Sequence, residues 1–282
     1  MGNSHPDKAV TTETTEEKTK TESLTVEEAI ANLESPDLGL RFYAAWWLGR
    51  FRVQEQAGVT KLIKALKDED DRTPEGGYPL RRNAARALGK IGNHEAIPAL
   101  IESLDSTDFY VREASAQSLE MLNDRVCIPA LVKLLQQGIL GEDLIPEQPD
   151  FSQPYDSIIE ALGTLGATST IPLIKPFLIH PIQRIQYAAA RAMYQLTNET
   201  VYGEKLSQAL LGDDLQLRRA ALSDLGAIGY LPAAEAITQT LAENSLKLIA
   251  LKGLLEHEIK GKDSNTLSEN AIRVMDLMDS LL

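Results

Sequence analysis

Two arginines that lie four positions apart, Arg82 and Arg86, are the residues whose type and spacing first suggest chemistry. Residues at this spacing share one stripe of a helix, so the two guanidinium groups would lie side by side. Such groups repel each other, but together they suit a ligand that carries carboxylates. Other arginines recur along the chain, among them Arg81, Arg112 and Arg218. For these the structural alternative is an Asp–Arg ladder that ties one repeat to the next.

Aromatic side chains are concentrated in one segment, which holds both tryptophans of the chain. On a helix, Tyr43, Trp47 and Arg50 would form one stripe, and Phe42 and Trp46 would form another. Such rings near the end of a repeat fold suggest a surface that is covered by a partner or by a flat ligand. The alternative is that the rings seal the end of the fold against the preceding helix.

Familiar catalytic and metal-binding motifs are not found in the sequence. The four histidines, His5, His94, His180 and His257, are scattered and lack the spacing of metal ligands. Glycine-rich loops that bind phosphate are also lacking. The single cysteine, Cys127, lies in an apolar Val-Cys-Ile-Pro run and is expected to be a small buried residue. We therefore expect no metal cofactor.

Composition limits the class of protein further. The chain has 282 residues, of which 43% are hydrophobic and only 5% aromatic, a balance that favours packed helices over strands. The net charge of −13 makes nucleic acid an unfavourable partner. One cysteine allows no internal disulfide, and no stretch approaches the roughly 18 apolar residues of a membrane helix. We expect a soluble, intracellular protein without a membrane span.

A repeated pattern organises the chain after Leu24. Arginine, alanine and then leucine recur at helical spacing, and glycine often follows the leucine. The marker positions are Leu48, Leu88, Leu119, Leu162, Met193 and Leu225. The gaps between them are 40, 31, 43, 31 and 32 residues, which indicates a basic period near 31 with two insertions. A fixed period of this size predicts stacked supersecondary units.

Each repeat is predicted to be a helical hairpin. After the Leu-Gly pair comes a turn and a second apolar run that begins with proline in its first helical turn, as at Pro98 and Pro129. We therefore predict an all-α protein, an α-solenoid of about six HEAT-like hairpin repeats over residues 24–259. Residues 1–23 are polar and are expected to be a disordered tail. Residues 260–282 are expected to form a linker and an amphipathic helix that caps the last repeat or docks on a partner.

Three segments resemble a known family. They are Tyr43–Arg52, Arg72–Lys90, which contains Gly-Gly-Tyr-Pro, and Gln153–Asp156, at the end of the larger insertion. The sequence from about Leu24 to Glu258 resembles the phycobilin lyases of cyanobacteria, specifically the E-type subunit of the E/F heterodimeric enzymes. The hairpin pattern is generic, whereas the Trp-Trp segment and the Gly-Gly-Tyr-Pro insertion are much more specific.

The resemblance implies an activity that composition could not. It implies that phycocyanobilin, a linear tetrapyrrole, is joined by a thioether to a cysteine of the phycocyanin α subunit, with an F-type subunit as partner. The client supplies the thiol, so the lyase needs no nucleophilic cysteine. The Asn-His-Cys motif of the lyase-isomerases is missing, which implies attachment without isomerisation. The expected location is the cytoplasm, at or near the phycobilisome. The alternative is a non-catalytic HEAT-repeat scaffold or chaperone for phycobiliprotein assembly.

The chemistry of a bilin then assigns candidate residues. Its two propionates favour arginine forks, for which the candidates are Arg50, Arg81, Arg82, Arg86 and Arg112. Its rings favour aromatic walls, for which the candidates are Tyr43, Trp47, Tyr78 and Tyr155. Its pyrrole N–H groups favour a carboxylate, Asp156 or Glu113, and an acid that protonates the bilin would make the A ring more electrophilic. The insertions at residues 71–79 and 138–154 either border the binding face or are passive loops.

Overall fold

The computed structural model describes residues 24–141, 153–260 and 266–282. Across these ranges it contains α-helices, short 3₁₀ segments and no strand. The predicted tail at residues 1–23 and most of the larger insertion lie outside the described residues. The prediction of an all-α solenoid is confirmed.

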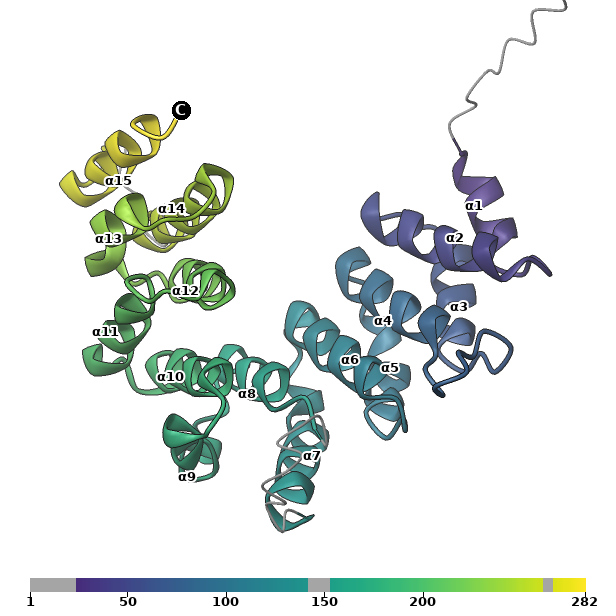
Figure 1. The fold of residues 1–282 in the computed structure, drawn as a ribbon. Helices are drawn as coiled ribbons and strands as arrows, with labels where there is room; N and C mark the ends of the chain where they lie inside the picture. Colours follow the sequence, from purple (N-terminus) through teal and green to yellow (C-terminus); the bar gives the residue numbers. More distant parts are fainter. Residues whose placement is uncertain (1–23, 142–152, 261–265) are drawn as a thin grey trace, which may run out of the picture.

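Seven helices stack side by side into an inner layer that lines the concave side of an arch (Figure 1). Its members are α2 (Leu38–Arg50), α4 (Pro79–Ile91), α6 (Phe109–Leu122), α8 (Tyr155–Thr164), α10 (Gln183–Thr197), α12 (Leu215–Ile228) and α14 (Asn244–Ile259). An outer layer packs behind them. Its members are α3 (Gln56–Ala65), α5 (Ile97–Ser103), α7 (Ile128–Gly141), α9 (Ile171–Ile174), α11 (Thr200–Ala209) and α13 (Ala234–Gln239). These two layers form six hairpins, α2/α3 to α12/α13.

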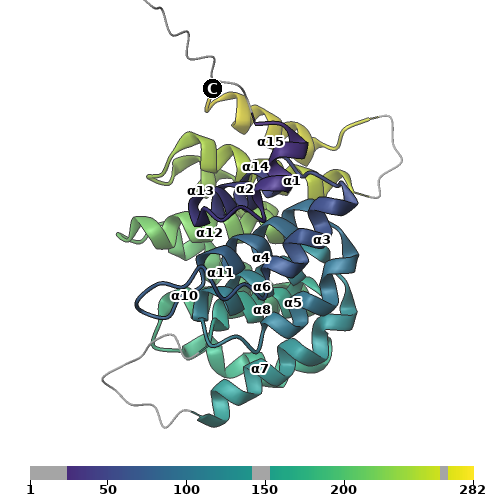
Figure 2. The same cartoon turned by 90° about the vertical axis from the view of Figure 1, so that its right-hand side faces the viewer.

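Short helices close both ends of the arch. At one end α1 (Val26–Asn32) packs on α2 and α3, and at the other α15 (Glu269–Asp279) packs on α13 and α14. Ala271 and Val274 of α15 are buried in this contact, whereas Leu282 is exposed. The two tips of the arch, which carry α1 and α15, point toward the same side of the molecule, and α7 lies on the opposite side (Figures 1 and 2).

Local sequence fixes where the inner helices begin and end. Asp108 and Asp214 accept hydrogen bonds from backbone N–H groups in the first turns of α6 and α12, which satisfies donors that have no partner within the helix. Gly92 ends α4 with φ of 81°, a left-handed conformation that glycine adopts without strain. Pro98 and Pro129 lie in the first turns of α5 and α7, where the missing N–H costs nothing.

The glycines of the repeated Leu-Gly pairs allow the inner helices to approach closely. A Cβ atom added at Gly49 would lie 2.6 Å from the Cα of Ala87, and one added at Gly89 would lie 2.7 Å from the Cβ of Ser118. Both distances are shorter than van der Waals contact, so any larger residue would push neighbouring repeats apart. The Leu-Gly signature is therefore a requirement of repeat stacking.

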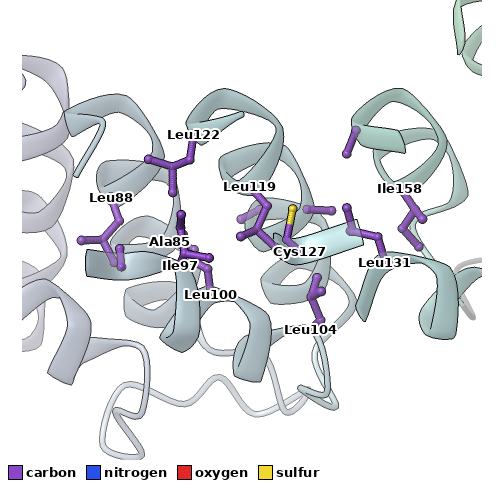
Figure 3. Packing of buried hydrophobic residues seen from close by; sticks show 14 of the residues in the cluster. Ala85, Leu88, Ile97, Leu100, Leu104, Leu119, Leu122, Cys127, Leu131 and Ile158 are labelled. Atoms are coloured by element: carbon purple, nitrogen blue, oxygen red, sulfur yellow. The ribbon is translucent and has the colours of Figure 1, made fainter. Parts of the chain in front are cut away.

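Between the layers, leucines fill a continuous core. Figure 3 shows Leu88, Leu100, Leu119 and Leu131, all fully or almost fully buried, between successive hairpins. Cys127 is buried among them, as the sequence predicts. The core continues to α10, where a second cluster begins that extends to α15.

Candidate functional site

Arg82 and Arg86 lie on the inner face of α4, because Leu80, Ala84 and Leu88 occupy its buried side. The guanidinium carbon of Arg82 lies 5.4 Å from the ring centroid of Tyr110 on α6, and its Nε has no hydrogen-bond partner among the described residues. Arg86 pairs with Glu113 of α6 at 3.5 Å, and its side chain is 41% exposed. The two arginines therefore share one face of α4, as the spacing predicts, with Arg86 partly exposed and Arg82 half-buried.

Two carboxyl groups lie beside these arginines. Burial raises the pKa of the Glu113 carboxyl, and Asp156 at the start of α8 raises it further, while Arg86 and Arg82 act in the opposite direction. The net effect favours the protonated form of Glu113. The structure thus brings together four of the predicted residues, Arg82, Arg86, Glu113 and Asp156, although they come from three different helices.

The Gly-Gly-Tyr-Pro insertion lies next to Arg82. It turns back on itself through a hydrogen bond from Thr73 N to Gly77 O, and Asp108 of the next repeat accepts a hydrogen bond from Tyr78 N at 2.7 Å. A cavity of about 420 Å³ lies between this turn and the start of α6, and Arg82 and Tyr110 contribute to its wall. Its size is in the range of small-molecule sites. The insertion therefore borders a pocket that Arg82, one of the two arginines, also lines.

Aromatic side chains on α2 divide into two groups. Tyr43 and Trp46 are stacked with centroids 5.5 Å apart and are 47% and 44% exposed. Trp47 instead packs on Phe51 and on the hydrophobic core. Of the predicted stripe, Tyr43 is exposed, whereas Trp47 is only partly exposed. The reason is that four residues turn a helix by about 400°, which displaces Trp47 about 40° from Tyr43 toward the buried side. Arg50 remains exposed.

Two other candidates from the first insertion are engaged in stacking the repeats. Tyr78 is buried, and the guanidinium carbon of Arg81 lies 3.8 Å from the centroid of its ring. Arg81 donates a hydrogen bond to Asp68 O at 2.5 Å and forms an ion pair with Glu69. These contacts follow the predicted ladder between repeats and leave little of either side chain for a ligand.

Arg112 and Tyr155 are also largely enclosed. Arg112 is buried and donates hydrogen bonds to the backbone oxygens of Ser106 and Thr107 at 2.7 and 3.1 Å. Burial lowers the pKa of its guanidinium group. Tyr155 is buried and its ring centroid lies 5.2 Å from that of Phe177. Neither side chain is exposed on the inner face.

A charge cluster that the sequence analysis missed includes Asp156 and joins four consecutive inner helices. Its members are Glu120 of α6, Asp156 and Glu160 of α8, Arg184 and Arg191 of α10, and Asp224 of α12. The only signal in the sequence is that Glu160, Arg191 and Asp224 interrupt apolar or alanine-rich helices. Which arginine meets which acid depends on stacking and could not be read from the sequence.

Burial within this cluster has a large effect on one acid. Burial raises the pKa of the Glu160 carboxyl to about 8, with Asp224 acting in the same direction and Arg184 and Arg191 opposing it.

Among the described residues, no group of three or more His, Cys, Asp or Glu side chains is placed to hold a metal ion. None of the described helices is long and apolar enough to cross a membrane.

Comparison with known proteins identifies the family. The chain is 64% identical over 261 residues to a phycocyanobilin lyase subunit alpha of a Nostoc species, with 92% of this chain and 94% of that protein covered. The chain belongs to the phycocyanobilin lyase α-subunit family. A member from Synechococcus elongatus is 54% identical over 94% of this chain and 98% of its own length. The bilin biosynthesis protein PecE of Mastigocladus laminosus is 47% identical over 86% of this chain and 85% of its own length.

Structural comparison gives the same family. The complex of CpcE and CpcF of phycocyanin lyase from Nostoc contains a chain that is 62% identical and matches with a TM-score of 0.86. The match covers 94% of this chain and 97% of that chain. HEAT repeats match residues 26–120 and 77–138, in agreement with the hairpins of the N-terminal half.

Proposed function

We propose that this chain is the α (E-type) subunit of a phycocyanobilin lyase. With an F-type partner, it attaches phycocyanobilin by a thioether to a cysteine of the phycocyanin α subunit, in the cytoplasm at or near the phycobilisome. Membership of the phycocyanobilin lyase α-subunit family carries the proposal, since relatives with that name match more than nine-tenths of the chain. The inner face of the arch supports it, because its side chains suit the chemical groups of a bilin.

The propionates of the bilin fit Arg82 and Arg86. Both guanidinium groups lie on the inner face, where Arg86 pairs with Glu113 and Arg82 lies over the ring of Tyr110. Arginine binds carboxylates through paired hydrogen bonds, so two neighbouring arginines suit a ligand with two propionates. Arg50 offers a further exposed cation on α2. Arg81 and Arg112 contribute indirectly, by fixing the repeats on which the exposed arginines stand.

For the rings of the bilin, the exposed aromatic side chains are the stacked pair Tyr43 and Trp46 on one side of α4 and Tyr110 on the other. A flat conjugated ligand gains from stacking on such rings. Tyr78, Trp47 and Tyr155 are packed within the fold and support this surface from behind. We therefore place the bilin along the inner face of α2, α4 and α6, with its pyrrole N–H groups toward Asp156 at the start of α8.

Glu113 and Asp156 provide two acids with different roles. We assign to Glu113 the role of proton donor to the bilin, which would make the A ring more electrophilic, and the raised pKa of its carboxyl favours that role. We assign to Asp156 the role of accepting hydrogen bonds from the pyrrole N–H groups.

The bond-forming step uses the client thiol. Its sulfur bonds to the ethylidene carbon of ring A and a proton is added to the ring, so the addition needs no oxidant or reductant. Burial raises the pKa of the Cys127 thiol to about 11, which argues against a nucleophilic role for this residue. Free bilins react with thiols unaided, so the contribution of the lyase is to fix the conformation and orientation of the bilin.

Co-expression tests the proposal. The chain, an F-type subunit, the phycocyanin α subunit and a source of phycocyanobilin are produced together, and covalent pigment is scored by zinc-enhanced fluorescence on a denaturing gel. Omission of this chain should abolish the correct adduct at the client cysteine. If the adduct formed equally well without it, the proposal would be wrong and a non-catalytic scaffold role would replace it.

A further inference from the structure

The charge cluster is built around Arg184, whose three nitrogens each face a different carboxyl group. Nη1 lies 2.7 Å from Asp224 Oδ2, Nη2 is paired with Glu160, and Nε lies 3.7 Å from Asp156 Oδ2. The acids come from α8 and α12, on either side of the helix that carries Arg184. A planar guanidinium held at two nitrogens has little freedom left at the third.

The two inner acids of the charge cluster are held firmly. Asp224 has a side chain that is only 1% exposed and also lies 3.5 Å from Arg191. Glu160 pairs with the same two arginines, at 2.9 Å in the case of Arg191. Arg191 is fixed in turn by Glu120 of α6. Arg184 is therefore oriented by a buried frame that reaches three neighbouring helices.

Packing alone gives no reason for such a cluster. Four carboxyl groups share two arginines, and the desolvation of buried charges often exceeds the energy that their attraction returns. Apolar side chains could stack these helices at lower cost, as they do elsewhere in the core. Asp156 and Arg184 are the most exposed members of the cluster, with side chains that are each 29% exposed, and Asp156 is also the electrostatic neighbour of Glu113.

Resting on the proposed function, we infer that Glu160 and Asp224 act through Arg184 as positioning residues that aim Asp156 at the pyrrole N–H groups of the bilin. An acceptor on a freely rotating side chain would have to be ordered each time the bilin binds, and that ordering costs free energy. Because Glu160 and Asp224 hold Arg184, Asp156 is ordered before the bilin binds. A preorganised acceptor holds the flexible tetrapyrrole in one conformation while the client thiol attacks.

A double-mutant cycle with Asp156→Asn and Arg184→Lys tests this inference. Lysine keeps the charge but cannot contact three carboxyl groups as a planar fork does. Arg184→Lys should lower kcat for bilin attachment about tenfold, about as much as Asp156→Asn, and should broaden the visible absorption band of bilin bound to the subunit pair. In the Asp156→Asn background, Arg184→Lys should cause almost no further change, because the residue through which Arg184 acts is already altered.

The matched control is Arg219→Lys, on the same inner layer. Arg219 pairs with Glu243 at the surface and forms none of the contacts of the charge cluster, so this variant should match the unmodified chain in rate and spectrum. Thermal unfolding is measured for each variant. The inference would be overturned if Arg184→Lys had the same effect with and without Asp156→Asn, because a simple folding defect would not depend on Asp156. It would also be overturned if the effect of Arg184→Lys were no larger than that of the control. If the proposed function itself were wrong, the adduct would form even when the chain is omitted, and this outcome distinguishes that failure from failure of the inference about Arg184.

Discussion

Replacing Arg82 and Arg86 together by alanine should weaken the binding of phycocyanobilin to the subunit pair about 100-fold. A hydrogen bond to a charged group contributes about 1.5–3 kcal/mol. Arg82 is half-buried against Tyr110, so we assign it about 2 kcal/mol. Arg86 is 41% exposed and already paired with Glu113, so solvent screening reduces its share to about 1 kcal/mol. The sum of about 3 kcal/mol corresponds to about two decades in Kd.

Titration of the purified subunit pair with phycocyanobilin, followed by absorbance and fluorescence, measures this change. The matched control replaces Arg125 and Lys133 by alanine, which removes the same net charge at exposed positions outside the site. The control variant should bind bilin about as tightly as the unmodified chain. A Kd for the Arg82/Arg86 variant within about twofold of the control value would refute the assignment of the propionates to these arginines.

Three further predictions concern stability and reactivity. Gly89→Ala should lower the free energy of unfolding by about 1–3 kcal/mol in denaturant titrations, because the new methyl group would clash with Ser118, and an unchanged midpoint would contradict the stacking argument. The unfolded chain releases the Glu160 proton near the ordinary pKa of 4.5, whereas the folded chain keeps it until about 8, so stability should fall as pH rises between these values. Glu160→Gln should flatten that decline in melts at several pH values. Cys127 should resist thiol reagents at pH 8 in the folded chain and react fully in denaturant, and Cys127→Ala should retain lyase activity, since burial holds the thiol pKa at about 11.

Much of the site could be predicted because spacing on a single helix is a local property. Arg82 and Arg86 had to share a stripe, and the burial of Leu80, Ala84 and Leu88 on the opposite side of α4 placed this stripe on the inner face of the arch. Spacing alone did not fix the exposure of Trp47, because this side chain lies at the edge of its stripe and packs on Phe51 and on the core. Tyr110 was not identified, since nothing local marks it as exposed.

The sequence by itself determined the class of fold. The repeat period, the capping residues and the Leu-Gly pairs are short-range signals, and each specifies a hairpin that must stack on its neighbours to bury its apolar face. Only the tertiary structure decided which side chains meet across the stack. Glu120 and Arg191 are 71 residues apart, yet they pair because α6 and α10 both line the inner face. Pairing at that separation depends on the curvature of the whole arch, which no local pattern encodes.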